Sequence, residues 1–183
     1  DFAFGHKRSG NVNRLQSEGS SHGFMAHTVS PQRHEGTRYA SSAIRAALQL
    51  GDMALATTLL GRPHAVAGRI VHGDGRGASI GFATANIAHQ PHMLLPAHGV
   101  YAVLLEVDGA VHKAVANCGL RPTFGGEGTR LEVHVLGSAP DLYGARAQVH
   151  MLARLRGEVR FDSVDALKAQ IAKDCEAARA IHA

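Results

Sequence analysis

The sequence predicts a mainly β protein: a small closed antiparallel barrel of five or six strands, with a helical hairpin before it and one α-helix after it. Three observations favour this fold class. Short segments rich in β-branched residues recur between residues 65 and 156, and glycine, aspartate or proline separates them. Apolar residues take helical spacing before and after this region. Many short antiparallel strands in one compact stretch commonly close into a barrel.

The first forty residues show no sustained hydrophobic period, so they are expected to form loop with at most one short element. Helical spacing begins after them, with Ser41 or Ser42 as the expected N-cap. The dipeptide Gly51-Asp52 is expected to end this helix and to begin a second one, which Gly61 ends. A short helical hairpin is the expected result.

The β region contains clear strand and turn signals. The expected strands are residues 65–73, 100–109, 111–119, 131–137 and 147–156. Asp108-Gly109 stands at the end of one of them, just before the next, and is typical of a two-residue hairpin turn. After the last strand, Ser163 is the expected N-cap of a helix in which Leu167, Ile171 and Cys175 share one face. This helix is therefore expected to pack on the barrel.

The composition is that of an ordinary globular protein with a mild positive charge. Of the 183 residues, 45% are hydrophobic, and 19 Lys and Arg oppose 15 Asp and Glu for a net charge of +4. This charge suits an anionic small molecule as well as a nucleic acid. The basic residues are scattered, which disfavours a nucleic-acid tail. Aromatic residues make up 5% and Trp is absent, so stacking platforms for single-stranded nucleic acid are scarce.

Cysteine and histidine usage narrows the chemistry further. Cys118 and Cys175 stand in unrelated contexts, so no disulfide framework is expected, and a reducing cytoplasm is the expected location. No apolar run approaches the ~20 residues that a membrane helix needs, and no signal peptide is recognised. The 13 histidines form no H-x3-H or H-E-x-x-H pair with acidic or cysteine support, so a histidine-based metal site is not expected.

The stretch GRGASIGFATANIA (75–88) raises the first question of chemistry. Glycines let the backbone turn sharply and direct several N–H groups towards one anion, and Arg76 would add a positive charge. Thr84 and Asn86 would face the same side of an extended segment and offer two hard oxygen ligands of the kind that Mg²⁺ accepts. A plain glycine-rich loop, with Thr and Asn bound to turn amides, explains the same residues.

Two further segments carry candidate residues. In the strand at 131–137 the alternate residues are apolar, which leaves Glu132 on the other face as a general base or as part of a solvated polar surface. After the strand that contains Asn117, Arg121 precedes Pro122 in a rigid turn, where it could clamp a phosphate or hold a loop. The residues alone leave both pairs of alternatives open.

The order of these motifs resembles the riboflavin kinase module of the bacterial bifunctional riboflavin kinase/FMN adenylyltransferase (FAD synthetase) family. Eight segments follow the family pattern: GRPH (61–64), GRIVHG (68–73), GASIGFATAN (77–86), GVY (99–101), NCGLRPTF (117–124), LEVH (131–134), DLYG (141–144) and RGEVRF (156–161). The resemblance covers roughly residues 58–180. It implies a six-stranded Greek-key barrel with a C-terminal α-helix.

The resemblance also implies an activity, that of an ATP:riboflavin 5′-phosphotransferase, which makes FMN and ADP from riboflavin and ATP with Mg²⁺. It implies that Glu132 is the base for the ribityl 5′-hydroxyl and that Thr84 and Asn86 are the metal ligands. The expected ATP and phosphate contacts are Gly73, Gly75, Arg76, Gly77, Gly81 and Thr84. The expected supporting residues are Asn117, Arg121 and Arg156. Residues between Leu136 and Tyr143, with the C-terminal helix, are expected to close over the flavin.

The beginning of the chain resembles the adenylyltransferase half of the same family, through DFAFGHKRSG (1–10) and ASSAIR (40–45). Residues 1–60 are therefore expected to be the C-terminal remnant of that α/β domain, and residues 61–183 the riboflavin kinase barrel domain. The chain lacks an H-x-G-H-type nucleotide-binding motif. FMN adenylyltransferase activity is thus not expected from it.

The sequence departs from the family pattern at three places. Ala83 stands where the family has the proline before the threonine, Ala78 replaces an arginine, and LGSAP (136–140) replaces the usual L-D-F. The metal and base positions are unchanged. Two alternatives stay open: a full bifunctional enzyme that also converts FMN to FAD, and a flavin-binding barrel without catalysis. Neither a membrane nor a nucleic acid is expected as a partner, and the oligomeric state is open.

Overall fold

The computed structural model describes residues 2–73, 75–123, 126–138 and 141–182. Within these ranges, the side chains of residues 76, 121–123 and 126–128 lie outside the description. Contacts between residues divide the chain into two compact units, Asp1–Tyr39 and Ala40–Ala183.

The first unit contains more regular structure than the sequence predicted. Its elements are β1 (Ala3–Phe4), the 3₁₀ helix η1 (His6–Arg8), β2 (Gly10–Asn11), α1 (Val12–His22), β3 (Arg33–His34) and β4 (Thr37–Arg38). The expectation of at most one short element was wrong, because α1 alone has 11 residues. The residues that mark α1 in the sequence are its two caps. The Asn11 side chain accepts from the Arg14 amide at 3.0 Å, and Gly23 ends the helix at φ 74°.

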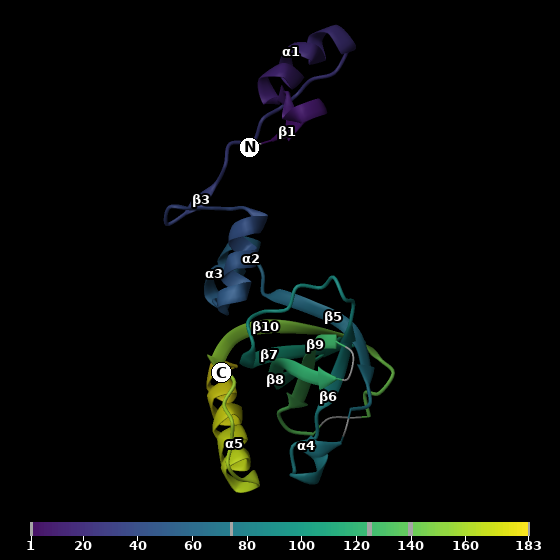
Figure 1. The fold of residues 1–183 in the computed structure, drawn as a ribbon, viewed down its shortest axis with the longest axis vertical. Coiled ribbons are helices and arrows are strands. Elements are labelled where there is room, and N and C mark those ends of the chain that lie inside the picture. Colours follow the sequence, from purple (N-terminus) through teal and green to yellow (C-terminus); the bar gives the residue numbers. More distant parts are fainter. Residues whose placement is uncertain (1, 74, 124–125, 139–140, 183) are drawn as a thin grey trace. The chain divides into compact units, whose positions relative to one another are not determined.

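The second unit is a closed six-stranded antiparallel barrel with helices around it (Figure 1). Its strands are β5 (His64–Val71), β6 (Ala85–His89), β7 (Gly99–Val107), β8 (Ala110–Thr123), β9 (Gly126–Val135) and β10 (Arg146–Arg156). Around the barrel they follow the order β10-β5-β6-β9-β8-β7. Strands β7, β8 and β9 form a meander and β10 returns beside β7, which is a Greek key. The predicted fold class is confirmed.

The helices of this unit are α2 (Ser41–Leu50), α3 (Met53–Leu60), the short α4 (Arg76–Ser79) and α5 (Val164–Ile181). Asp52 and Ser163 cap α3 and α5 as predicted, accepting from backbone amides at 3.0 and 3.1 Å. The N-cap predicted for α2 was wrong: Ala40 occupies that position with extended backbone, and both serines already lie inside the helix. Asp108 and Gly109 have φ of 49° and 81°, as a type I′ hairpin turn requires.

Strand β7 is buried on both faces, and its alternate side chains belong to two separate apolar clusters, one on each face. Tyr101, Val103 and Leu105 point into the barrel, where they join the main core with residues of α2 and α3. Val100 and Ala102 point outwards and pack with Cys175 of α5. The C-terminal helix therefore covers the outer surface of the barrel, as its apolar face predicted, and an external site can form beside it.

Hydrogen bonds from the buried Tyr101 and the half-buried His64 attach the loop between β6 and β7 to the rest of the unit. The Tyr101 hydroxyl donates to the Ala97 carbonyl, and His64 Nε2 lies 2.8 Å from the Leu94 carbonyl oxygen. The Ala97 amide donates to the Leu48 carbonyl of α2 at 2.8 Å. Burial raises the pKa of Tyr101 to about 12 and lowers the pKa of His64, so both side chains are uncharged at neutral pH.

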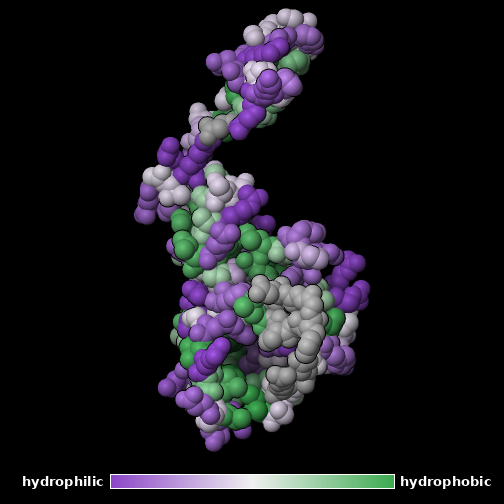
Figure 2. All heavy atoms as spheres, viewed as in Figure 1, coloured by the Kyte–Doolittle hydropathy of each residue, from purple (hydrophilic) through white to green (hydrophobic). Residues whose placement is uncertain are grey.

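Some apolar surface stays exposed on this unit. Figure 2 shows hydrophobic surface over the α2–α3 hairpin, where the Leu50 side chain is exposed. Across the described part of the chain, no helix combines the length and the apolar character that crossing a bilayer requires.

Candidate active site

A cavity of about 560 Å³ lies on the outer surface of the barrel. Strands β6, β8 and β9 provide polar side chains on one side, and α5 with residues 158–161 provides the other side. Residues of the short helix α4 also line it. The cavity is therefore built from segments that are far apart in the sequence.

Strand register explains how these segments meet. Asn86 lies opposite Glu132, and Glu132 lies opposite Asn117 on its other side. Asn117 lies opposite Val100, which lies opposite Arg156. These five residues, the register row, run across five adjacent strands, and all of them line the cavity. Side chains directly opposite each other in antiparallel strands share one face and lie close together.

Two bulges in β10 decide which arginine joins the register row. The pairing with β7 shifts between Met151 and Ala153, and again between Arg154 and Arg156. Each shift adds one residue to β10 relative to β7, so Arg156 rather than Arg154 stands opposite Val100. Bulges of this kind redirect side chains locally.

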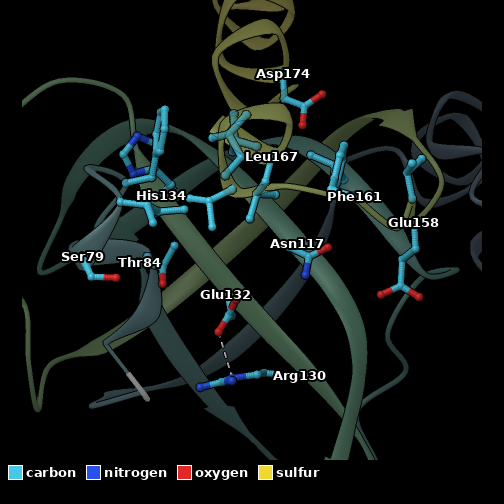
Figure 3. A pocket seen from close by; sticks show the side chains of 18 of the residues that line it. Ser79, Thr84, Asn117, Arg130, Glu132, His134, Glu158, Phe161, Leu167 and Asp174 are labelled. Carbon is cyan, nitrogen blue, oxygen red and sulfur yellow. Dashed lines mark ion pairs between the residues drawn. The ribbon is translucent and has the colours of Figure 1, made fainter. Parts of the chain in front are cut away.

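The polar end of the cavity centres on Glu132, Asn86 and Arg130. Arg130 Nε donates to Asn86 Oδ1 at 2.5 Å and lies 3.0 Å from Glu132 Oε1. Figure 3 shows this ion pair, with Thr84 and Ser79 to one side and Asn117 to the other. The Asn86 residue is 7% exposed and the Glu132 side chain 26% exposed, so Glu132 is partly shielded but still accessible from the cavity.

Two glycines let the backbone approach the two predicted metal ligands. A Cβ at Gly73 would overlap Asn86 Nδ2 and would lie 2.9 Å from Arg130 Nη2. A Cβ at Gly77 would overlap the Phe82 carbonyl oxygen and would lie 3.2 Å from Thr84 Oγ1. Glycine is therefore required here for close packing, since real Cβ atoms do not approach other atoms so closely.

His134 supports the segment that carries Thr84. Its Nδ1 lies 2.8 Å from the Ala83 carbonyl oxygen, and its ring meets Phe82 edge-on at 5.5 Å between centroids. Ala83 is the position at which the family pattern has proline. A hydrogen bond from the neighbouring strand thus restrains the residue before Thr84.

The other end of the cavity is apolar. Its side chains form what we call the apolar wall: Phe82, Val159, Phe161, Val164, Leu167 and Ile171. The sequence analysis expected the segment between Leu136 and Tyr143, together with the C-terminal helix, to cover a flat ring. Of these, only the helix contributes to the described lining, and residues 139–140 lie outside the description.

Three carboxylates line the cavity, and their surroundings differ. Asp174 is 6% exposed and accepts from Arg156 Nε and Nη2 at 3.0 and 2.8 Å, and from Gln170 at 2.8 Å. Glu158 lies at the right of Figure 3, away from Thr84 and Ser79. It lies beside Gly119, and one of its oxygens is 3.9 Å from His98 Nδ1. Glu132 alone lies between Asn86 and Asn117, so it is the best-placed base candidate.

The pair of Arg156 and Asp174 joins the end of β10 to α5, and we predict that it is needed for stability. Asp174→Asn should lower the free energy of unfolding by about 3 kcal/mol, because it leaves a largely buried guanidinium without its counter-charge. Urea unfolding of both proteins measures this difference. Glu176→Gln, which removes an exposed charge from the same helix, should change stability by less than about 0.5 kcal/mol. Equal effects of the two substitutions would contradict the prediction.

Most residues that the sequence singled out come together at this cavity. Its lining includes Gly75, Gly77, Thr84, Asn86, Asn117, Glu132 and Arg156. Gly73 lies behind Asn86, and Gly81 adopts φ 91° in the turn that follows α4. The side chains of Arg76 and Arg121 lie outside the description. The turn expected at Arg121 and Pro122 was wrong, because both residues continue strand β8. The roles assigned to all these residues stay predictions.

Sequence reasoning missed Arg130 and Asp174. Arg130 precedes Glu132 by two residues, so strand alternation places both on the outer face of β9, and this spacing was an available signal. Asp174 follows Gln170 by one helical turn, but nothing in the sequence identifies its partner on β10.

The donor atoms at the polar end are neutral oxygens and one carboxylate. Among the residues that the structure describes, no three His, Cys, Asp or Glu side chains gather as a metal-binding group. Thr84 and Asn86 offer a hydroxyl and an amide oxygen instead, which is a donor set for a hard cation that keeps other oxygen ligands.

Comparisons with known proteins identify the family. The chain belongs to the riboflavin kinase (flavokinase) family, whose sequence model matches residues 60–182. The resemblance drawn from the eight motifs is thereby confirmed. The matched segment begins at residue 60, whereas the division of the chain into compact units falls between Tyr39 and Ala40. The predicted domain boundary at residue 61 therefore stays a prediction.

Relatives extend this finding. A bifunctional riboflavin kinase/FMN adenylyltransferase of Escherichia coli K12 is 46% identical over 177 residues, which are 95% of this chain and 56% of that protein. The protein of the same description from Bacillus subtilis is 36% identical over 179 residues, with the same coverage. A crystal structure described as a macrolide-efflux protein from Streptococcus pneumoniae aligns with TM-score 0.88 and 35% identity, covering 98% of this chain and 58% of that one. The chain spans about half the length of the curated relatives that it matches.

Proposed function

We propose that this chain is a riboflavin kinase that transfers the γ-phosphoryl group of ATP to the ribityl 5′-hydroxyl of riboflavin, giving FMN and ADP. One observation carries the proposal: a single cavity has Asn86, Glu132 and Asn117 at one end and the apolar wall at the other. A flat ring with a polyol tail suits such a cavity, since ring burial favours apolar contacts and hydroxyls need polar partners. Membership of the riboflavin kinase family supports this substrate.

Glu132 is the proposed general base. As the 5′-oxygen bonds to the γ-phosphorus, the bond from that phosphorus to the β-phosphate oxygen breaks, and ADP leaves with its electron pair. The hydroxyl proton passes to the Glu132 carboxylate. Phosphoryl transfer depends mostly on positioning and charge neutralisation, so the main task of Glu132 is to orient the hydroxyl. Arg130 and the register row restrain Glu132 in its position.

The segment from Gly73 to Gly81 is the proposed phosphate-binding loop. Gly75 and Gly77 line the cavity, and backbone amides there can donate to phosphate oxygens without a side chain in between. Arg76 lies between these two glycines and is the proposed cationic contact. Gly73 and Gly81 are proposed to shape the loop. Arg121 and Arg156 are proposed to support the site or the loops that cover it.

The proposed metal ligands are Thr84 and Asn86, for Mg²⁺. Their hydroxyl and amide oxygens fit this ion, and both residues line the cavity beside the glycine segment. When bound, Mg²⁺ would neutralise charge on the phosphates. The close packing of Gly73 and Gly77 keeps the two side chains in place.

An assay of the purified chain tests the proposal. With riboflavin, ATP and Mg²⁺, we expect FMN to accumulate in equal amount with ADP, as resolved by reversed-phase chromatography with fluorescence detection. Reactions without ATP or with EDTA are the controls. If riboflavin binds by fluorescence quenching but no FMN forms, the chain is a flavin-binding barrel and the proposed activity is refuted.

A further inference from the structure

Arg130 holds a position that no motif of the sequence assigned. It lies on the outer face of β9, its side chain is 24% exposed, and it lines the cavity. Its Nε contacts both a proposed metal ligand, Asn86, and the proposed base, Glu132. Its Nη2 lies close to the position that a Cβ on Gly73 would take, at the start of the glycine segment. One guanidinium therefore contacts the proposed metal ligand and the proposed base, and it lies beside the start of the glycine segment.

One of these contacts uses an oxygen that the proposed metal ion would need, and the other uses the carboxylate beside it. Asn86 Oδ1 accepts from Arg130 at 2.5 Å, and Glu132 Oε1 faces the same nitrogen at 3.0 Å. A divalent ion at Asn86 would share this oxygen with a positive guanidinium, and two like charges so close repel each other in a partly shielded site. Arg130 thus competes with a free metal ion for this place.

A nucleotide changes this balance. Its phosphates bring negative charge, and two oxygens of one phosphate group can accept from the planar guanidinium in a bidentate way, as a carboxylate does. With phosphates present, Arg130 can bind them in place of Asn86 and Glu132, and the negative phosphates reduce the repulsion between the guanidinium and the metal ion.

We propose, resting on the proposed function, that Arg130 is a positioning residue that excludes free divalent metal from Asn86 and Glu132 and binds nucleotide phosphates instead. The metal ion then enters together with the nucleotide rather than before it. Arg130 also keeps Glu132 oriented while no substrate is present.

Two binding measurements without turnover test this inference. The first titrates Mn²⁺ alone and follows free Mn²⁺ by electron paramagnetic resonance. The second titrates ADP in EDTA by isothermal titration calorimetry. For Arg130→Gln we expect opposite changes: Mn²⁺ binds about tenfold tighter and metal-free ADP about tenfold weaker, because removing the charge favours the ion and disfavours the phosphate.

The controls separate charge from general loss of structure. Arg69→Gln makes the same change of charge on β5, outside the cavity lining, where Arg69 donates to the Gly144 carbonyl at 2.6 Å. It should leave both affinities unchanged. Arg130→Lys keeps a positive charge and should keep weak Mn²⁺ binding; it also serves if Arg130→Gln fails to fold.

The outcomes distinguish this inference from the proposed function. Loss of both affinities together in Arg130→Gln, or no change in Mn²⁺ affinity, overturns the inference even if the wild-type chain makes FMN. If the Arg130→Gln protein does not fold, Arg130→Lys takes its place in the test. In that case, Mn²⁺ binding that is tighter in Arg130→Lys than in wild type overturns the inference. Opposite shifts support the inference even if no FMN forms, in which case only the proposed function fails.

Discussion

Glu132→Gln should lower kcat for FMN formation by about 10²- to 10⁴-fold, the range that a positioned general base contributes. Glutamine keeps the size of the side chain and can still contact Arg130, but it cannot accept the hydroxyl proton. The KM for riboflavin should change little, since the apolar wall that would hold the ring is untouched. Steady-state kinetics with chromatographic detection of FMN measure both constants.

A second carboxylate on the barrel offers a matched control. Glu106 on β7 lies 2.8 Å from His150 Nε2, and it is not among the residues that line the cavity. Glu106→Gln makes the same chemical change in a comparable strand pair and should leave kcat within about twofold of wild type. If both variants turn over alike, Glu132 is not the base.

Gly73→Ala should lower kcat/KM by about 100-fold, the cost that a displacement of about 1 Å can carry in a positioned site. The new methyl group would overlap Asn86 Nδ2 and press on Arg130 Nη2, and the buried Asn86 has little room to move. Both the proposed metal ligand and the partner of Glu132 would shift. Kinetics over a range of Mg²⁺ concentrations should show a raised metal requirement.

Gly157→Ala is the control for this substitution. A Cβ there would meet only Arg154 Nη2, at an ordinary 3.6 Å. Activity and unfolding midpoint should stay near those of wild type. An active Gly73→Ala protein with an unchanged Mg²⁺ requirement would show that Asn86 is not a metal ligand.

Five of the six barrel strands were predictable because their residues alternate and their turns are marked, but β6 was not among the expected strands. Asp108 and Gly109 identify one hairpin directly, and the cap residues Asp52 and Ser163 locate two helix starts. The helix in the first unit was not predictable from periodicity, because its side chains bury little and only its caps stand out. Turn and cap residues thus predicted an element correctly where the tertiary contacts of the fold favour the same element.

The site was predictable only in part. Alternation placed Glu132 on the outer face of its strand, but it could not say that Asn86 and Asn117 would flank it. The position of Asn86 and Asn117 beside Glu132 depends on which strands pair and in which register. No short stretch of the sequence shows this pairing. The spacing of Thr84 and Asn86 suggested a pair of metal ligands, and the family resemblance favoured that interpretation over a plain loop. Arg130 could have been found from its spacing to Glu132.

The two bulges in β10 have a consequence for how the family can vary in length. Because each adds one residue relative to β7, Arg156 and not Arg154 reaches Val100, and Asp174 then ties α5 to that arginine. Deleting either extra residue would put another residue in the place of Arg156, so Asp174 of α5 would lose its partner. The apolar wall would then move away from Glu132. Insertions should therefore be tolerated in the loops of this barrel, but the number of residues in β10 should be as constrained as the identity of the proposed base, Glu132.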